Sequence, residues 1–329
     1  MSRTQTDKLD VVGHQWAIEL LQKQHQAGHF PQALLLAGPL QVGKATLGRY
    51  LARVLNCQGA SKPCGTCLSC HKLVSGNHPD VRIFDQEDEA IKIDQIRELQ
   101  RELALSPLES QYRVALLCNF ERATTSAANA LLKTLEEPTE QVILILTATD
   151  PSQLLPTIVS RCQVLTLRPL PQREILEALQ TRWGLFGKRA ELLSQLAAGR
   201  LGWAVRAMAD EAFLARRERR LNELLELLRT GRAERLDYAQ EFSRDAGAIK
   251  EILGLWLAIW RDLLLLQSGS HTKLINLDWR DTLEPLAAQM TIGQTKEMVV
   301  RVRTALLNLE RNVNPRLNLE VVLLKLPVC

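Results

Sequence analysis

The stretch Gly38–Thr46, GPLQVGKAT, restricts the fold of this chain more than any other feature. It follows the apolar run Ala33–Ala37, which has the length and bulk of a buried strand, and precedes apolar residues at helical spacing over 47–55. In a phosphate-binding loop, a strand, a glycine-rich loop and a helix follow one another in this order. The backbone N–H groups surround the phosphate oxygens and the lysine neutralises their charge. A bare glycine and lysine pattern also marks ordinary turns, but these flanking segments favour the phosphate loop.

The loop lacks a group that nucleotide hydrolysis needs. Ala45 stands where a working loop has a Ser or Thr hydroxyl on Mg²⁺. Thr46 is a poor substitute, because one residue along a helix is a rotation of about 100° around its axis. We therefore assign Gly38, Gly43, Lys44 and Thr46 to a degenerate nucleotide site, which can still bind ATP or ADP through the loop backbone and Lys44.

A second catalytic group is missing at the end of a neighbouring strand. The candidate strand Arg113–Leu117 runs into Cys118 and Asn119, where a hydrolysing protein has an acid that holds the metal. Glu121 follows too late in the sequence to replace that acid. Two losses in one site predict that the chain does not hydrolyse nucleotide.

Four of the seven cysteines lie close together in the sequence, at Cys57, Cys64, Cys67 and Cys70. The spacing C-x6-C-x2-C-x2-C brings four thiolates within reach of one tetrahedral ion, and zinc is the metal that such a set favours. A four-iron cluster uses a similar spacing, but its fourth cysteine usually lies downstream beside a proline, whereas His71 follows here. We expect a structural zinc site, with an iron cluster or unliganded thiols as alternatives.

Length and composition indicate a water-soluble globular protein of two or three domains. The chain has 329 residues, of which 46% are hydrophobic and 24% charged. No stretch approaches the roughly 18 apolar residues of a membrane span, and the start, MSRTQTDKLD, has neither the apolar core nor the cleavage site of a signal peptide. We expect a cytoplasmic protein without membrane contact. The net charge of +4 permits contact with nucleic acid but does not require it.

Two patterns of elements divide the chain near residue 168. Five apolar runs before it predict strands of a doubly wound parallel sheet, with helices expected over 94–105 and 126–135. The strands are expected at Ala33–Leu36, Val81–Phe84, Val114–Leu117, Val142–Thr147 and Val164–Leu167. The rest is predicted to be helical over 173–181, 189–198, a short stretch near Trp203, 211–229, 248–266, 291–312 and from Leu317 onward, with breaks at 230–236, 267–273 and 313–315.

Together these residues resemble the clamp-loader subunits of bacterial DNA polymerase III, within the AAA+ ATPases. The resemblance covers residues 10 to about 170 and rests on motifs in a fixed order: GPLQVGKAT, the cysteine cluster, Asn129–Pro138 (NALLKTLEEP), Leu146–Thr149 (LTAT) and Ser160–Cys162 (SRC). The decayed nucleotide site resembles that of the delta-prime subunit more than that of the hydrolysing tau/gamma subunit. The stretches Trp260–Leu264 and Asn312–Glu320 look like the helical collar of the same subunit.

The resemblance implies a fold, a role and partners. The fold is an AAA+ core over 1–168 with a zinc module at 57–70, a helical lid over 169–209 and an all-helical collar for oligomerisation over 210–329. The role is that of a non-hydrolysing subunit of the DNA polymerase III holoenzyme, which helps to load the sliding clamp onto primed DNA. The partners are tau/gamma and delta subunits.

Arg161 matches the arginine finger that enters a neighbour's ATP site in this family. A guanidinium is always charged and presents several donors, so it suits a γ-phosphate; a surface salt bridge is the alternative for this residue. The helix through NALLKTLEEP, which a residue of Thr124–Ser126 can cap and Pro138 ends, carries Glu136 and Glu137 at its unfavourable negative end. We expect these acids or Lys133 either to meet a neighbouring subunit or to order the sensor region, with a solvated helix end as the alternative.

The family's second sensor arginine is replaced by Gly202, with Arg200 nearby. Two other functions remain possible from the sequence. One is a tau/gamma-like ATPase that hydrolyses ATP by itself, and the other is a zinc-stabilised binding module without a replication role.

Overall fold

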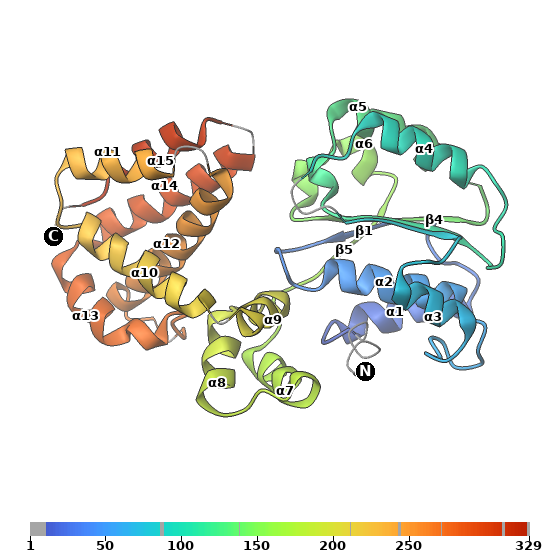
Figure 1. Ribbon diagram of the computed structural model, residues 1–329, viewed down its shortest axis with the longest axis horizontal. Coiled ribbons are helices and arrows are strands. Elements are labelled where there is room, and N and C mark those ends of the chain that lie inside the picture. Colours follow the sequence, from blue (N-terminus) through green and yellow to red (C-terminus); the bar gives the residue numbers. More distant parts are fainter. Residues whose placement is uncertain are drawn as a thin grey trace. The chain divides into compact units, whose positions relative to one another are not determined.

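The computed structural model describes residues 11–85, 89–137, 139–210, 212–242, 245–270, 272–310 and 313–327. The predicted helix end at Pro138, the start MSRTQTDKLD and Asn312 lie outside the described residues. The chain forms two compact units (Figure 1). The first contains the described residues up to Ala190 together with Ala198–Ala204, and the second contains Glu191–Ala197 and the described residues from Val205 onward.

The first unit is built around a parallel sheet. Its elements are α1 (Gln15–Gln26), β1 (Ala33–Ala37), α2 (Lys44–Asn56), α3 (Leu68–Ser75), β2 (Val81–Phe84), α4 (Ile93–Leu103), β3 (Arg113–Leu117), η2 (Phe120–Arg122), α5 (Thr125–Glu136), β4 (Val142–Ala148), η3 (Pro151–Gln153), α6 (Pro156–Val159), β5 (Gln163–Thr166) and α7 (Gln172–Trp183). The strand order is β2-β3-β4-β1-β5, and each neighbouring pair is parallel. The predicted doubly wound sheet is confirmed, with the five strands within about one residue of their expected positions.

Both faces of the sheet are covered, which explains why its strands are continuous apolar runs rather than alternating ones. Helices α1, α2 and α3 lie on one face and α4, α5 and α6 on the other (Figure 1). Along β1, Leu34 and Leu36 belong to the core beneath α1 and α2, whereas Ala33 and Leu35 belong to the core beneath α4 and α5. The central strands therefore lie between two separate hydrophobic cores.

Helix α2 approaches the sheet unusually closely at Gly48. A β-carbon added to this residue would lie 2.6 Å from Cδ1 of Leu116 on β3 and 3.5 Å from Cγ2 of Ile145 on β4. No larger side chain fits here unless the strand residues move. This contact fixes the helix that begins at the phosphate loop against the middle of the sheet.

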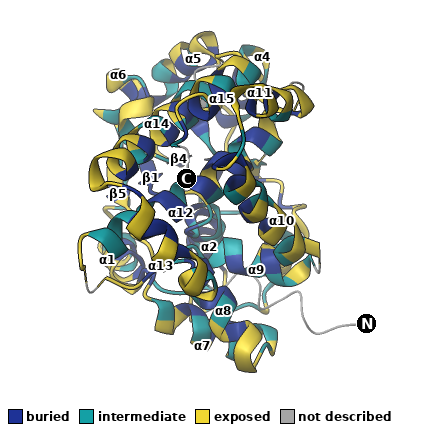
Figure 2. Ribbon diagram, turned by 90° about the vertical axis from the view of Figure 1, so that its left-hand side faces the viewer, coloured by how far each residue is buried: buried dark blue, intermediate teal, exposed yellow. Residues whose placement is uncertain are grey.

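The second unit is helical. Helices α8 (Gly187–Leu196) and α9 (Leu201–Ala209) are divided between the two units, and the second unit then contains α10 (Ala212–Leu227), α11 (Arg232–Glu241), α12 (Ala246–Gln267), η4 (Leu277–Trp279), α13 (Arg280–Gln289), α14 (Ile292–Glu310) and α15 (Pro315–Leu323). Its core surrounds the fully buried Trp256 and Trp260 of α12. Helix α10 buries one side and exposes the other (Figure 2), whereas most residues of α12 are buried or intermediate.

Two helices of this unit depart from the sequence prediction. Helix α11 begins inside the expected break at 230–236, and α13 was not predicted. The buried residues of α11 are Arg235 and Ala239, so it has no apolar stripe. The guanidinium of Arg235 instead donates to the carbonyl oxygens of Leu227, Leu326 and others near the end of the described chain.

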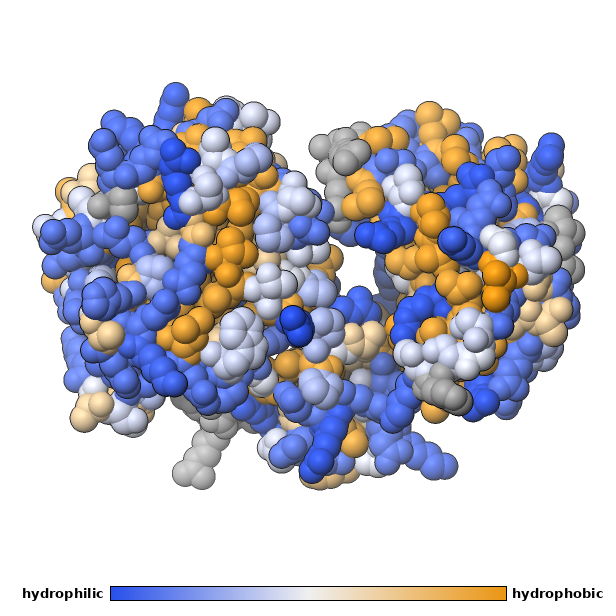
Figure 3. Space-filling view, turned by 180° about the vertical axis from the view of Figure 1, so that it is seen from behind, coloured by the Kyte–Doolittle hydropathy of each residue, from blue (hydrophilic) through white to orange (hydrophobic). Residues whose placement is uncertain are grey.

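Among the described residues, we find no helix with the length and apolar content that a bilayer span requires. In the view of Figure 3, hydrophobic patches interrupt a mostly hydrophilic surface. On the second unit, exposed apolar side chains include Val300 of α14 and Val321 of α15, which are 55% and 58% exposed.

Candidate functional sites

The phosphate loop has the backbone that its sequence predicts. It joins β1 to α2, and Gly43, the residue before the helix, has a φ of 112°, a conformation that favours glycine. The free N–H groups of the first turn of α2 therefore begin at the loop, where an anion would be stabilised. The buried ring of His14 contacts the loop, with its Nε2 3.0 Å from the carbonyl oxygen of Val42.

Lys44 is buried and folds back onto the loop. Its Nζ donates to the carbonyl oxygens of Gly38 at 2.6 Å and of Pro39 at 2.9 Å. Burial lowers the pKa of Lys44 to about 8, against the opposing effect of Glu121 and Cys118. The ammonium group is thus held in the loop, within electrostatic range of the residues that follow β3.

The residues after β3 offer no oxygen ligand at the position of the expected metal-binding acid. Cys118 is buried, and burial raises the pKa of its thiol to about 12, so the group is neutral at ordinary pH. Glu121 turns to β4, where its Oε1 accepts from the backbone N–H of Thr149 at 3.0 Å and from its hydroxyl at 2.7 Å. The other oxygen, Oε2, is buried without a hydrogen-bond partner among the described residues.

The start of α9 lies directly against the phosphate loop. The backbone N–H of Gly202 donates to the carbonyl oxygen of Gln41 at 2.9 Å, and a β-carbon on Gly202 would lie 3.0 Å from that oxygen. A long side chain at position 202 would therefore force the loop or the helix to shift. Arg200 is partly buried, and burial lowers the pKa of its guanidinium.

Arg161 is held at the surface of the first unit, just after α6. Its Nη2 lies 2.7 Å from Oε1 of Glu136, in the last turn of α5, and its Nη1 donates to the carbonyl oxygen of Thr157 at 2.8 Å. The two side chains are 34% and 50% exposed. Glu136 thereby gains a cation at the unfavourable end of its helix. At the other end, Thr124 caps the helix by accepting from the N–H of Ala127.

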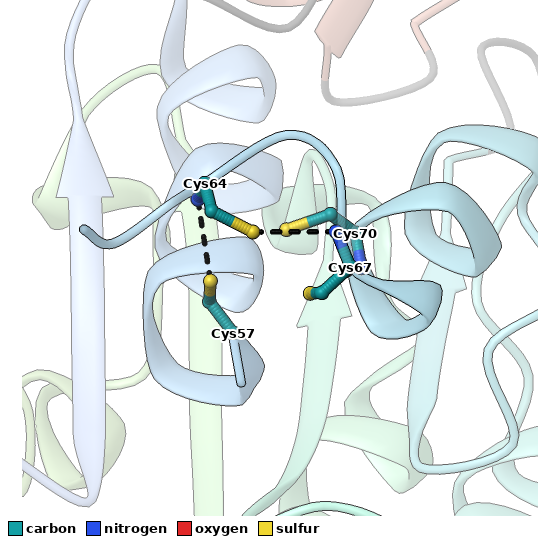
Figure 4. Close-up of side chains that lie close together, drawn as sticks. All are labelled: Cys57, Cys64, Cys67 and Cys70. Carbon is teal, nitrogen blue, oxygen red and sulfur yellow. Dashed lines mark hydrogen bonds between the residues drawn. The ribbon is translucent and has the colours of Figure 1, made fainter. Parts of the chain in front are cut away.

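The four predicted metal ligands come together in space (Figure 4). Their sulfur atoms all lie within 4.8 Å of one another. Cys57 ends α2, Cys67 begins α3, Cys70 lies in the first turn of α3, and Cys64 lies on the loop between the helices. The fold therefore brings these four cysteines, which are close in sequence, together around one point in space; we call them the cysteine cage.

Backbone N–H groups point at these sulfur atoms. Cys57 Sγ accepts from the N–H of Cys64 at 3.2 Å, Cys64 Sγ from Cys67 at 3.3 Å, and Cys67 Sγ from Cys70 at 3.5 Å. Hydrogen bonds from Thr66 and Cys67 lower the pKa of the Cys64 thiol to about 5, whereas burial raises that of Cys70 to about 12. Four sulfur donors with N–H groups aimed at them fit a divalent ion with soft ligands, which displaces the remaining thiol protons on binding.

The contacts that support these residues were not predicted from the sequence. The Glu121–Thr149 contact and the Glu136–Arg161 ion pair join residues that are distant in sequence, so no local pattern indicates them. Arg53, a buried arginine one turn before Cys57, was also missed. Its signal in the sequence is a basic residue at the helical spacing i, i+4 from a metal ligand.

Comparisons with known proteins agree with these observations. The family model described as DNA polymerase III, delta subunit, matches residues 13–171, and the model described as its C terminal matches residues 211–327. A DNA polymerase III subunit delta' from Bacillus subtilis is 30% identical over 302 residues, which cover 90% of this chain and 91% of that protein. A subunit delta' from Pseudomonas aeruginosa is 37% identical over 199 residues, which cover 59% of this chain and 52% of that protein.

A solved structure, a DNA polymerase III gamma subunit-related protein from Thermotoga maritima, is 19% identical with a TM-score of 0.43 and covers 92% of this chain and 97% of its own. The family assignment rests on the sequence matches, which extend over both units. The chain belongs to the family of DNA polymerase III delta-prime subunits.

Proposed function

We propose that this chain is a non-hydrolysing subunit of a clamp loader that donates Arg161 to the ATP site of an adjacent tau/gamma subunit. The observation that carries the proposal is the composition of its own phosphate loop. The loop keeps its glycines and Lys44, but Ala45 and Cys118 stand where the two oxygen ligands for Mg²⁺ would be. In an ATP-driven complex, a subunit that does not hydrolyse ATP itself acts on the ATP that is bound by a neighbouring subunit.

The nucleotide site of this chain supports binding without turnover. Backbone N–H groups at the start of α2 and the ammonium of Lys44 attract phosphate. The hydroxyl of Thr46 lies about 100° around the helix from the metal position, and Gly202 provides no second arginine. We infer that ATP or ADP binds here as a structural ligand.

Arg161 supports a role on a neighbour's nucleotide. Its guanidinium is at the surface, and its partner Glu136 is a half-exposed carboxylate, so exchanging that carboxylate for a phosphate oxygen costs little. An arginine supplied in this way accelerates phosphoryl transfer by about 10³–10⁵. Under this proposal, Arg161 pairs with Glu136 in the isolated chain and contacts the phosphate of a neighbouring subunit in the complex.

We further infer the assembly around this subunit. The helical region from 210 serves as the collar that joins tau/gamma and delta subunits, and residues 169–209 form the lid of the AAA+ core. Through this complex the chain acts on the sliding clamp and primed DNA. Cytoplasmic reducing conditions suit the four cysteines, which are free thiols in the described structure.

A structural zinc ion is proposed for the cage of Cys57, Cys64, Cys67 and Cys70. The ion would supply a cross-link between the end of α2 and the start of α3. A site with four protein sulfur ligands has no open position, so it takes no part in catalysis. Its contribution is to hold the connection from the phosphate-loop helix to β2.

Reconstitution of the clamp loader with Arg161→Ala tests the central claim. We expect assembly to remain intact while DNA-stimulated ATP hydrolysis by the tau/gamma subunit that receives this arginine falls by at least about tenfold in single-turnover measurements. Arg97→Ala serves as the matched control, because Arg97 is an exposed arginine of the same unit with only a 3.8 Å contact to Asp94. Unchanged hydrolysis with Arg161→Ala, or Mg²⁺-dependent hydrolysis by the isolated chain, would contradict the proposal.

A further inference from the structure

The last turn of α2 contains a buried cation without an acceptor. Arg53 is 5% exposed, and its Nε and Nη1 are inaccessible to solvent and have no hydrogen-bond partner among the described residues. A guanidinium does not lose its proton in a protein, and a buried charge is costly unless it is paired. No carboxylate of the described polypeptide pairs with Arg53, so these donors lack a counter-charge among its acidic residues.

The position of Arg53 indicates where that charge belongs. Arg53 precedes Cys57 by one helical turn, so both side chains project from the same face of α2. Gly65 lies between Cys64 and Cys67 on the ligand loop, and a β-carbon added to it would lie 3.8 Å from Nη2 of Arg53. The guanidinium thus lies against the loop that carries the sulfur ligands.

We propose that Arg53 is the charge partner of the metal–thiolate centre, an inference that rests on the proposed metal site. Four thiolates around one divalent ion sum to a charge of about −2, which is the negative charge that the buried guanidinium lacks. Removal of the metal removes this centre, so Arg53 is left without the charge partner that the centre provides. Arg53 therefore favours the metal-bound protein and disfavours the metal-free one.

Removing the charge of Arg53 is expected to have opposite effects on the stability of the metal-bound protein and of the metal-free protein. In Arg53→Met the side chain keeps most of its apolar length but loses the cation. The metal-bound protein then loses a partner for its negative centre, whereas the metal-free protein loses an unpaired buried charge. A packing role alone would weaken both states in the same direction.

The test uses the full-length chain with zinc as the probe. Zinc affinity is measured by competition with a chromophoric chelator for wild type, Arg53→Met, Arg53→Lys and the control Arg49→Met, whose arginine lies one turn earlier on α2 and pairs with Asp85. We expect about a 10–100-fold loss of affinity in Arg53→Met, a smaller loss in Arg53→Lys and none in Arg49→Met. The melting temperature of Arg53→Met should fall with zinc bound and stay equal or rise after the zinc is removed.

The outcomes separate this inference from the metal site on which it rests. Wild-type protein that binds no zinc at one equivalent would overturn both. Zinc-binding wild type with unchanged affinity in Arg53→Met, or with equal losses of melting temperature in the bound and stripped forms, would overturn the role of Arg53 and leave the metal site standing. The absorption of the Co²⁺-substituted proteins shows whether the four sulfur ligands are retained in each variant.

Discussion

At the scale of single residues, burial decides what the phosphate loop can do. Lys44 is a cation inside the protein, and burial lowers its pKa to about 8. Between pH 8 and the usual lysine value of 10.5, the unfolded chain binds this proton and the folded chain does not. The contribution of Lys44 to stability therefore rises with pH in that window, while its attraction for anions falls.

Nucleotide binding should follow the charge of Lys44. We expect the affinity for ADP, measured by calorimetry without Mg²⁺, to be nearly constant between pH 6.5 and 7.5 and to weaken above pH 8, approaching about tenfold per pH unit. Lys44→Met should bind ADP more weakly and show no such dependence. Equal affinities of the wild type at pH 7 and pH 9 would mean that Lys44 does not contact the phosphate.

At the scale of elements, the sequence predicts what is local and misses what tertiary contacts create. The five strands were found because strands buried on both faces are unbroken apolar runs. Helix α13 was not predicted because it has few buried residues and because Pro285, a residue that disfavours helix, lies within it. Helix α11 was not predicted because an arginine occupies its buried face. The phosphate loop and the cysteine cage were predicted because each is one short stretch of chain. The pairs Glu136–Arg161 and Glu121–Thr149 join distant stretches of chain, so no local pattern predicts them.

The loop between α4 and β3 illustrates a tertiary support of this kind. Asp80 is 2% exposed, and its carboxylate accepts from the backbone N–H groups of Leu108, Glu109 and Ser110 at 2.7, 3.0 and 3.0 Å. Arg113 lies 3.9 Å away. One side chain thus satisfies three backbone donors of the segment beside the metal module.

Replacing Asp80 should destabilise the first unit strongly. Asp80→Ala leaves three N–H groups without their acceptor and leaves the buried Arg113, which still donates to the carbonyl oxygen of Ser106, without its nearby counter-charge, so we expect the free energy of unfolding in urea to fall by at least about 3 kcal/mol. Asp80→Asn, which keeps an acceptor oxygen, should lose less. A loss below about 1 kcal/mol in Asp80→Ala would show that water replaces the carboxylate.

At the scale of the whole molecule, the two units have separate cores, and the helical unit has exposed apolar side chains beside a groove. A groove of about 500 Å³ runs between α14 and α15, with Val300 and Val321 among its lining residues. Both valines are more than half exposed. Charged residues also line this groove, among them Lys296, Glu297 and Arg301. If the proposed assembly holds, we expect the groove to receive a helix of another subunit.

Charges in this groove should weaken assembly and leave the fold intact. We expect Val300→Asp with Val321→Asp to reduce the fraction of chain that joins tau/gamma and delta in size-exclusion chromatography by about tenfold or more, because an aspartate would be buried at the interface. The melting temperature should stay close to that of wild type, since both positions are exposed. The control is Leu108→Asp, at a 74% exposed position of the first unit. Assembly equal to that of the control would place the collar contact elsewhere.

The tight approach of α2 at Gly48 links the composition of a helix to that of a strand. Because Leu116 already fills the space that a methyl group at position 48 would take, these two positions cannot vary independently. A chain of this fold that carries alanine in the helix is expected to carry a shorter residue than leucine opposite it. The helix therefore has no room to move toward the sheet when a ligand binds at the loop.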